Sequence, residues 1–282
     1  MSYALEVKGI SKKYPSFELR DVSFALEEGK IVGFIGRNGA GKTTTLKSLV
    51  NLVHPDSGEA FFFGRSFKDH ELEIKQDIGF VLGGIDYYPM KRLGTITNVT
   101  KAFYENWDEA VYQKYMKLFR LVDSKTPKEL SDGMKVKYSL VLALSHHARL
   151  LILDEPTSGL DPVSRDELLD VFLKLVDEEA VTILFSTHIT SDLERCADDI
   201  VYIKDGSIIE AGDMDEYISR HCLVQIESKQ LPENLDDVLI GIKKNRNGWS
   251  ALAFRTSSLP ECCKTSDATL QDIMVHLEKE EL

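Results

Sequence analysis

Short apolar runs alternate with amphipathic stretches along most of this chain, and that alternation predicts an α/β fold. The runs at 31–35, 150–153 and 181–186 have the length and composition of buried strands. Between the second and third runs, residues 163–178 repeat their apolar positions with a helical period. Strands that alternate with helices favour a parallel sheet, because a helical crossover lets consecutive strands run in the same direction.

A different pattern, alternation of single apolar and polar residues, precedes the first buried run. Leu5 and Val7 stand out in residues 3–14, and Val22, Phe24 and Leu26 alternate with polar neighbours. A period of two is typical of strands that bury one face, so we expect an antiparallel β layer before the parallel sheet. Further strands are predicted at 60–63 and 78–82, and a hairpin at 200–211.

Helical patterns dominate from about 86 to 147, which predicts a helical subdomain inserted into the β/α core. After residue 221, strand-like patterns return and are followed by a helical pattern. We therefore expect a large domain over 1–220 and a small α+β appendage over 221–282, whose role stays open among regulation, dimerisation and covering the core. In the appendage, strands are predicted at 223–226, 238–242 and 249–254, and an amphipathic helix at 269–280.

Composition narrows the class of protein. The 282 residues carry a net charge of −12, which argues against a nucleic-acid partner, since such binding relies on Lys and Arg contacts to phosphate. The first residues lack the apolar core of a signal peptide, and no apolar run is long enough to span a bilayer. The four cysteines fit neither a disulfide framework nor a zinc motif, so we expect free thiols and a cytoplasmic protein. If the protein works in transport, its pore must be another chain.

The residues after the run at 31–35 carry the clearest chemistry. Their pattern, G-x-x-x-x-G-K-T at the start of a predicted helix, is typical of a phosphate-binding loop. The glycines let backbone N–H groups point at phosphate oxygens, and the helix N-terminus adds partial positive charge. We expect Lys42 to reach the β- and γ-phosphates and the Thr43 hydroxyl to bind Mg²⁺. The predicted nucleotide-binding residues of this loop are Gly36, Arg37, Asn38, Gly39, Ala40, Gly41, Lys42, Thr43 and Thr44.

Three further polar residues follow predicted strands. Asp154 and Glu155 come after the run at 150–153, and His188 follows the run at 181–186. Ligands of parallel α/β sheets bind at the carboxyl ends of strands, so we expect these side chains to meet the phosphate-binding loop. Each residue alone also has a structural interpretation: a carboxylate pair often caps a helix, and a single histidine is usually structural.

Several motifs in this order resemble one family, the nucleotide-binding subunits of ATP-binding-cassette (ABC) transporters. The resemblance covers about residues 3–215. GRNGAGKTT at 36–44 is similar to the Walker A motif, and LLILDEP at 150–156 to Walker B. LSDGM at 130–134 stands at the family's LSGGQ signature, and SGLD at 158–161 at its D-loop. The resemblance implies a P-loop NTPase fold of the ABC type, with ATP and Mg²⁺ as cofactors.

The resemblance also implies a role for each matching residue. Glu155 polarises the attacking water, His188 bonds the γ-phosphate and links Glu155 to the water, and Asp154 holds Mg²⁺ through water. Lys42 also acts in catalysis. Ser131 and Gly133 cap the γ-phosphate bound by a second ATPase subunit, Asp161 helps join the two sites, and the ring of Tyr14 lies against adenine. By itself, Tyr14 could equally be a packing residue, and Ser131 a common helix start.

The sequence departs from the family at two places. Gly83 falls closest to the position of a glutamine that binds Mg²⁺ and senses the membrane partner, and Asp86 or water is left to replace it. In the signature, Asp132 and Met134 stand where the family has Gly and Gln. The first departure affects how ATP use is coupled to a partner more than ATP binding itself.

The leading hypothesis is an ATPase subunit on the cytoplasmic face of the cell membrane. It would drive a separate membrane-spanning permease by closing on ATP as a dimer with a second ATPase subunit, identical or different. The sequences of these motifs most resemble those of the branch of the family that exports drugs, antibiotics or lipids. The alternatives are a soluble cassette ATPase acting on ribosomes, DNA ends or iron–sulfur assembly, and a module that binds ATP only to regulate.

Overall fold

The structure is a computed structural model that describes residues 2–82, 88–228, 235, 238–246, 248–260 and 262–279. The chain forms two compact units. The first comprises residues up to His188 together with 195–211, and the second comprises 189–194 and 212–282. The predicted domain boundary at 220 therefore lies a few residues beyond the point where the second unit takes over.

An antiparallel sheet opens the first unit, as the alternating pattern predicts. Leu5, Val7 and Ile10 of its longest strand are all buried, with polar or partly exposed residues between them. The strand order is β2-β1-β4-β5. The strands are β1 (Tyr3–Tyr14), β2 (Phe17–Glu27), β4 (Ser57–Phe62) and β5 (Arg65–Ser66).

The buried apolar runs form a second, six-stranded sheet in the order β10-β9-β3-β8-β7-β6. The pairs β3/β8, β3/β9, β7/β8 and β6/β7 are parallel, so the predicted parallel sheet is confirmed. Its central strands are buried on both faces, which explains why their sequences do not alternate. The strands are β3 (Ile31–Ile35), β6 (Ile78–Leu82), β7 (Leu150–Asp154), β8 (Thr182–Thr187), β9 (Asp199–Lys204) and β10 (Ser207–Asp213).

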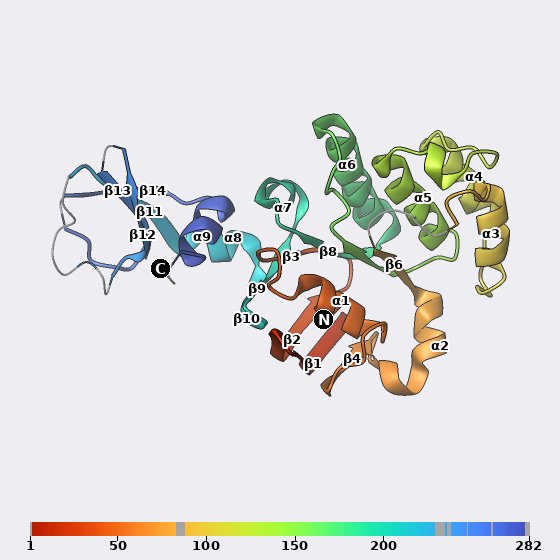
Figure 1. Cartoon of the computed structure of the whole chain (residues 1–282), viewed down its shortest axis with the longest axis horizontal. Coiled ribbons are helices and arrows are strands. Elements are labelled where there is room, and N and C mark those ends of the chain that lie inside the picture. The colour runs from red at the N-terminus through yellow and green to blue at the C-terminus, as the bar shows by residue number, and fades with distance from the viewer. Residues whose placement is uncertain are drawn as a thin grey trace. The chain divides into compact units, whose positions relative to one another are not determined.

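Helices cover this sheet and bury a shared core. Helix α1 (Lys42–Leu49) lies between the two sheets, and Leu46 and Leu49 on it are fully buried (Figure 1). Helices α5 (Asp132–Leu144) and α6 (Pro162–Glu179) pack on the sheet's other face (Figure 1). Helix α2 (Phe67–Asp77) was not predicted, because it buries only Phe67 and Ile74.

The predicted helical subdomain is present from residue 88, the first described residue after the gap. It consists of α3 (Leu93–Lys101), α4 (Glu109–Leu118), a single 3-10 turn (Pro127–Glu129) and α5 (Asp132–Leu144). Three buried hydroxyls join its helices: Thr97 of α3 contacts Tyr112 of α4 at 3.0 Å and Tyr138 of α5 at 2.7 Å. Helix α6 (Pro162–Glu179) follows, with Asp161 as N-cap and Pro162 in its first turn.

The second unit is a small α+β domain with the strand order β12-β13-β11-β14. Helix α8 belongs to it because Tyr217 on that helix packs on His221 of the first strand, with ring centroids 5.0 Å apart. Strand β14 was not predicted, since its sequence, CKTSD, is mostly polar and exposed. The elements are α7 (Thr190–Cys196, which spans the division), α8 (Met214–Ser219), β11 (His221–Ile226), β12 (Ile240–Asn245), β13 (Gly248–Phe254), β14 (Cys263–Asp267) and α9 (Leu270–Leu277).

The described residues contain neither a membrane-spanning helix nor a disulfide. Every helix there is too short or too polar to cross a lipid bilayer. The four cysteines, all of them in described ranges, form no disulfide.

His146 shows how the helical subdomain is attached to helix α2. Its buried ring stacks on Tyr104, with centroids 3.7 Å apart, and its Nδ1–H donates to the backbone oxygen of Gln76 at 3.0 Å. Burial lowers the pKa of His146 from 6.5 to about 4, because the charged ring would lose its hydration.

This depressed pKa predicts a loss of stability in mild acid. Between pH 6.5 and 4 the unfolded chain binds a proton at this residue that the folded chain does not, so the free energy of unfolding falls as the pH falls. The expected loss is about 1.4 kcal/mol per pH unit. Urea unfolding of the wild type and His146→Gln at pH 7.5, 6 and 5 checks it. Parallel pH curves for the two proteins would contradict the assignment.

Candidate active site

A glycine-rich loop between β3 and α1 forms the floor of the site. At Gly36 a Cβ atom would lie 2.3 Å from the backbone oxygen of Ile203, and Gly41 has a φ of 116°. Neither position accepts a side chain without distortion. Gly39, by contrast, has no protein atom within 4 Å of such a Cβ, so the loop is tightly packed on one side and open on the other. Its open side faces a cavity.

Lys42 begins helix α1 and turns back into this loop. Its side chain is only 5% exposed, and its ammonium donates to the backbone oxygens of Gly36 at 2.8 Å and Arg37 at 3.3 Å. A buried ammonium next to a helix N-terminus forms a positive site for an anion. The loop therefore has the composition that a phosphate group needs.

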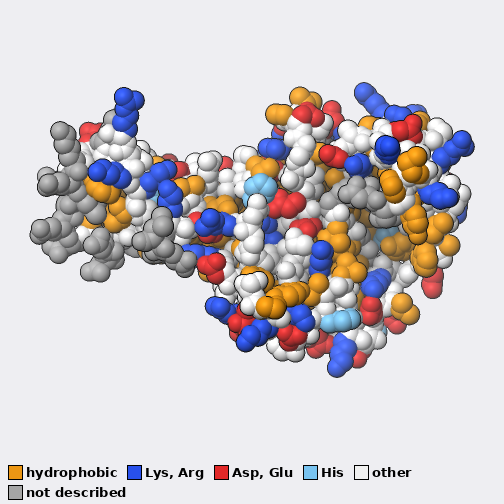
Figure 2. All heavy atoms as spheres, viewed as in Figure 1, with side chains coloured by type: hydrophobic (Ala, Val, Ile, Leu, Met, Phe, Trp, Pro, Cys, Tyr) orange, Lys and Arg blue, Asp and Glu red, His pale blue; other side chains and the backbone are white. Residues whose placement is uncertain are grey.

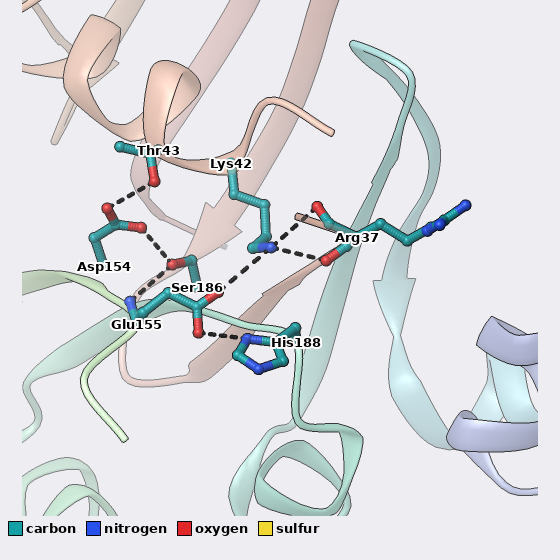
Figure 3. A network of polar contacts seen from close by, with 8 residues as sticks. Arg37, Lys42, Thr43, Asp154, Glu155, Ser186 and His188 are labelled. Carbon is teal, nitrogen blue, oxygen red and sulfur yellow. Dashed lines mark hydrogen bonds and ion pairs between the residues drawn. The ribbon is translucent and has the colours of Figure 1, made fainter. Parts of the chain in front are cut away.

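Asp154, at the carboxyl end of β7, is held by two hydroxyl groups (Figure 3). Thr43 donates to its Oδ2 at 2.8 Å, and Ser186 of β8 donates to its Oδ1 at 2.6 Å. Sequence reasoning found Thr43 but missed Ser186. The missed signal is the strand register, because Ser186 is the direct partner of Asp154 in the parallel β7/β8 pair.

Glu155 follows Asp154 and lies among three groups of the site (Figure 3). Its Oε1 lies 3.4 Å from Lys42 Nζ, and its Oε2 lies 2.9 Å from Nδ1 of His188. The backbone N–H of Glu155 donates to the Ser186 hydroxyl at 2.9 Å. Its φ is 50°, an uncommon backbone conformation for a residue with a side chain. The predicted meeting of Lys42, Asp154, Glu155 and His188 at one sheet edge is thus observed.

Lys42, Glu155 and His188 line an open cavity of about 570 Å³. Ser158, the first residue of the SGLD motif, also lines it, as do Ser16 and Phe17, which the sequence did not single out. Tyr14, expected to bind a base, is not one of the lining residues; it is 37% exposed and pairs with Phe17 across the β1/β2 hairpin. The predicted residues that do line the cavity are Arg37, Asn38, Gly39, Gly41, Lys42, Thr43, Thr44, Glu155 and His188.

Of the other predicted residues, Gly36, Ala40 and Asp154 are not among the lining residues either. Three more, Ser131, Gly133 and Asp161, lie at the starts of α5 and α6. Ser131 is the N-cap of α5 and accepts from the N–H of Met134 at 3.3 Å. Gly133 is buried, and a Cβ there would lie 3.3 Å from Leu160. Asp161 is the N-cap of α6, and the hydroxyl and N–H of Ser164 hold its pKa below the usual range. All three lie at helix starts, where N–H groups can bind an anion from another molecule.

The donor set fits a nucleoside triphosphate with a hard divalent cation. Lys42 and the loop N–H groups suit phosphate oxygens, and the Thr43 hydroxyl and Asp154 carboxylate suit Mg²⁺. Within the described residues no group of three His, Cys, Asp or Glu side chains could hold a metal ion alone. Gly83, which stands closest to the position of the family's glutamine, and Asp86, one of the two expected replacements for it, lie outside the described residues.

Comparison with known proteins agrees with this geometry. Residues 19–158 match the family described as "ABC transporter". The ABC transporter ATP-binding protein YtrB of Bacillus subtilis is 31% identical over 79% of this chain and 76% of its own length. The bacitracin transport ATP-binding protein BcrA of Bacillus licheniformis is 31% identical over 78% of this chain and 73% of its own.

Solved structures show the same fold. One titled "Structure of ATP binding subunit of ABC transporter" matches with a TM-score of 0.68 and 31% identity, over 76% of this chain and 91% of the other. A dimeric ATP-binding cassette, MJ0796, bound to ADP and phosphate, matches with a TM-score of 0.65 and 22% identity, over 74% of this chain and 98% of the other. The second likeness bears on the fold alone.

Proposed function

The chain belongs to the family of ABC transporter ATP-binding proteins, and from this premise we propose that it hydrolyses ATP to drive a separate membrane-spanning subunit. One observation carries the proposal: Lys42, Glu155 and His188 meet at the sheet edge where Thr43, Ser186 and Asp154 form a hydrogen-bonded chain. The first group suits attack on a phosphate, and the second suits a magnesium ion.

The residues divide the reaction between them. Lys42 binds the terminal phosphate oxygens, in place of the carbonyl oxygens it contacts in the structure. Glu155 orients a water molecule and takes its proton as the water oxygen bonds to the γ-phosphorus and the bond to ADP breaks. His188 holds the second carboxylate oxygen of Glu155. Thr43 and Asp154 would hold Mg²⁺, which would supply positive charge next to the phosphates.

We also propose that two ATPase subunits act together. Ser131, Gly133 and Asp161 lie at helix starts outside the cavity of their own chain. A second subunit would bring its own Ser131 and Gly133 to the ATP held by the first. The dimeric form of the MJ0796 cassette, which shares this fold, supports such an arrangement.

A surface on the helical subdomain suits the membrane-spanning partner. An open groove of about 610 Å³ runs along α3 and is lined mainly by apolar side chains. Phe103 is 72% exposed, and Tyr88 and Val99 are more than half exposed. Hydrophobic side chains gather over this part of the surface (Figure 2). Such a patch on a soluble domain indicates a protein contact. We assign it to a segment of the permease, which would hold the ATPase on the cytoplasmic face of the membrane.

The direction of transport that we propose is export. The chain spans 76% of YtrB and 73% of the bacitracin transport protein BcrA. The similarity to this bacitracin transport protein, 31% identical over 78% of the present chain, supports an exported drug, antibiotic or lipid as the substrate class.

If Glu155 is the general base, its removal should abolish ATP turnover without abolishing ATP binding. In Glu155→Gln, kcat for ATP hydrolysis should fall by about 100-fold or more, because the general base is removed. ATP binding should remain, and the ATP-bound dimer should accumulate. In the matched variant Lys42→Ala, binding itself should weaken. Phosphate release, nucleotide binding and light scattering measure these effects. Unchanged turnover in Glu155→Gln would refute the base assignment.

Tyr14 has a prediction of its own. The tyrosine is the direct strand partner of Phe17, which lies in the cavity wall, and we propose that its ring stacks on a bound adenine. Stacking on a base contributes about 1–3 kcal/mol. Tyr14→Ala should therefore weaken ATP binding about tenfold, and Tyr14→Phe should not. Inorganic tripolyphosphate, which has no base, should bind all three proteins equally; an equal loss for both ligands would exclude stacking.

The apolar groove predicts a selective loss of the membrane partner. Phe103→Asp should abolish recovery of a polytopic membrane protein with the tagged chain from detergent-solubilised membranes of its native host, measured by mass spectrometry. Basal ATPase activity should stay unchanged. Leu72→Asp, at an 81% exposed leucine on α2, is the control and should retain the partner. Equal recovery with Phe103→Asp would remove the groove from the interface, and ribosomal proteins in place of a membrane chain would favour a soluble ATPase.

A further inference from the structure

We propose that Ser186 is a positioning residue for ATP hydrolysis, which fixes both carboxylates of the site through one buried hydroxyl. The assignment rests on the proposed function, because it concerns the same site. Ser186 is fully buried on strand β8, two residues before His188. Ser186 is not one of the residues that line the cavity.

The hydrogen-bonding capacity of a serine hydroxyl explains why one residue can serve two carboxylates. A hydroxyl has one proton to donate and lone pairs to accept. Ser186 donates to Asp154 Oδ1 at 2.6 Å and accepts from the backbone N–H of Glu155 at 2.9 Å. Because the acceptor of the hydroxyl proton is a carboxylate, this bond is of the stronger, charge-assisted kind.

The first bond completes the hold on Asp154. Thr43 occupies Oδ2 and Ser186 occupies Oδ1, so the carboxylate cannot rotate without breaking one of the two bonds (Figure 3). Groups that hold a metal-binding carboxylate are typically worth about 10- to 100-fold in metal affinity or activity. Ser186 therefore sets the orientation in which Asp154 meets Mg²⁺.

The second bond acts on the backbone of Glu155. With a φ of 50°, Glu155 is in a left-handed conformation that residues with side chains rarely adopt. Its N–H has two acceptors on one residue, the hydroxyl of Ser186 at 2.9 Å and the backbone oxygen of Ser186 at 3.2 Å. Removing the hydroxyl weakens the hold on this conformation, and with it the direction in which the Glu155 side chain extends toward Lys42 and His188.

The chain offers a matched control for the loss of a buried hydroxyl. Ser145 is also fully buried, but its hydroxyl donates to Val141 of its own helix at 2.6 Å and contacts no site residue. Ser145→Ala thus removes the same atom with a local structural effect alone. Ser186→Thr keeps a hydroxyl at position 186. Thermal unfolding would be used to check that each variant is folded.

The test compares full-length wild type, Ser186→Ala, Ser186→Thr and Ser145→Ala. In Ser186→Ala we expect kcat for ATP hydrolysis to fall about 10- to 100-fold, with KM for ATP within about threefold of wild type. The Mg²⁺ concentration that half-saturates binding of a fluorescent ATP analogue should rise at least about fivefold. Ser145→Ala should match wild type in both quantities, and Ser186→Thr should recover most of the loss.

The results distinguish failure of the Ser186 assignment from failure of the proposed function. If wild type hydrolyses ATP and Ser186→Ala equals Ser145→Ala in kcat and in Mg²⁺ dependence, Ser186 has no positioning role. If Ser186→Ala lowers only the unfolding temperature, the hydroxyl is structural and the assignment is likewise overturned. If wild type neither binds nor hydrolyses ATP, the proposed function falls, and the role of Ser186 falls with it.

Discussion

The parallel pairing of three strands is the constraint on which the site depends. In the register of β3, β8 and β7, Ile35 pairs with Thr187 and Asp154 pairs with Ser186, so three chain segments end at the same edge. Because successive side chains of a strand point to opposite faces, a slip of one residue would turn the Ser186 hydroxyl away from Asp154. Since both faces of β8 are buried, its apolar side chains hold this register on either side. The core thus fixes the geometry of the polar groups.

Burying polar groups at this edge is costly unless each has a partner, and here the partners come from the site itself. Lys42 contacts two backbone oxygens and the carboxylate of Glu155, and Asp154 is bonded through both oxygens. The network is therefore formed by the protein alone, before any substrate contact is considered. Preformed donors and acceptors of this kind do not have to be reorganised when charge develops in a reaction.

Much of this arrangement could be predicted from the sequence, since the strongest patterns coincide with the buried parts of the sheet. The apolar runs at 31–35 and 150–153 were located within a residue or two, and the glycine loop after the first was placed at the site. Strand β14 could not be found, because CKTSD is exposed and has no apolar period. Ser186 and Phe17 could not be found either, because their roles depend on which strands are neighbours, and no local pattern encodes that. The apolar groove likewise depends on which helix faces are left exposed after packing.

The helical subdomain connects the proposed partner surface to the proposed subunit contact. Helix α3 carries Val99 and Ile96 of the groove and also Thr97, whose hydroxyl contacts Tyr138 on α5 at 2.7 Å. Tyr138 donates in turn to the backbone oxygen of Leu93 at 2.8 Å. These bonds are buried, so separating α3 from α5 would leave hydroxyl groups without partners in an apolar interior. The buried bonds therefore couple the two helices. A permease segment bound at the proposed surface that shifted α3 would also shift α5, and with it Ser131, which we propose contacts the ATP held by a second subunit.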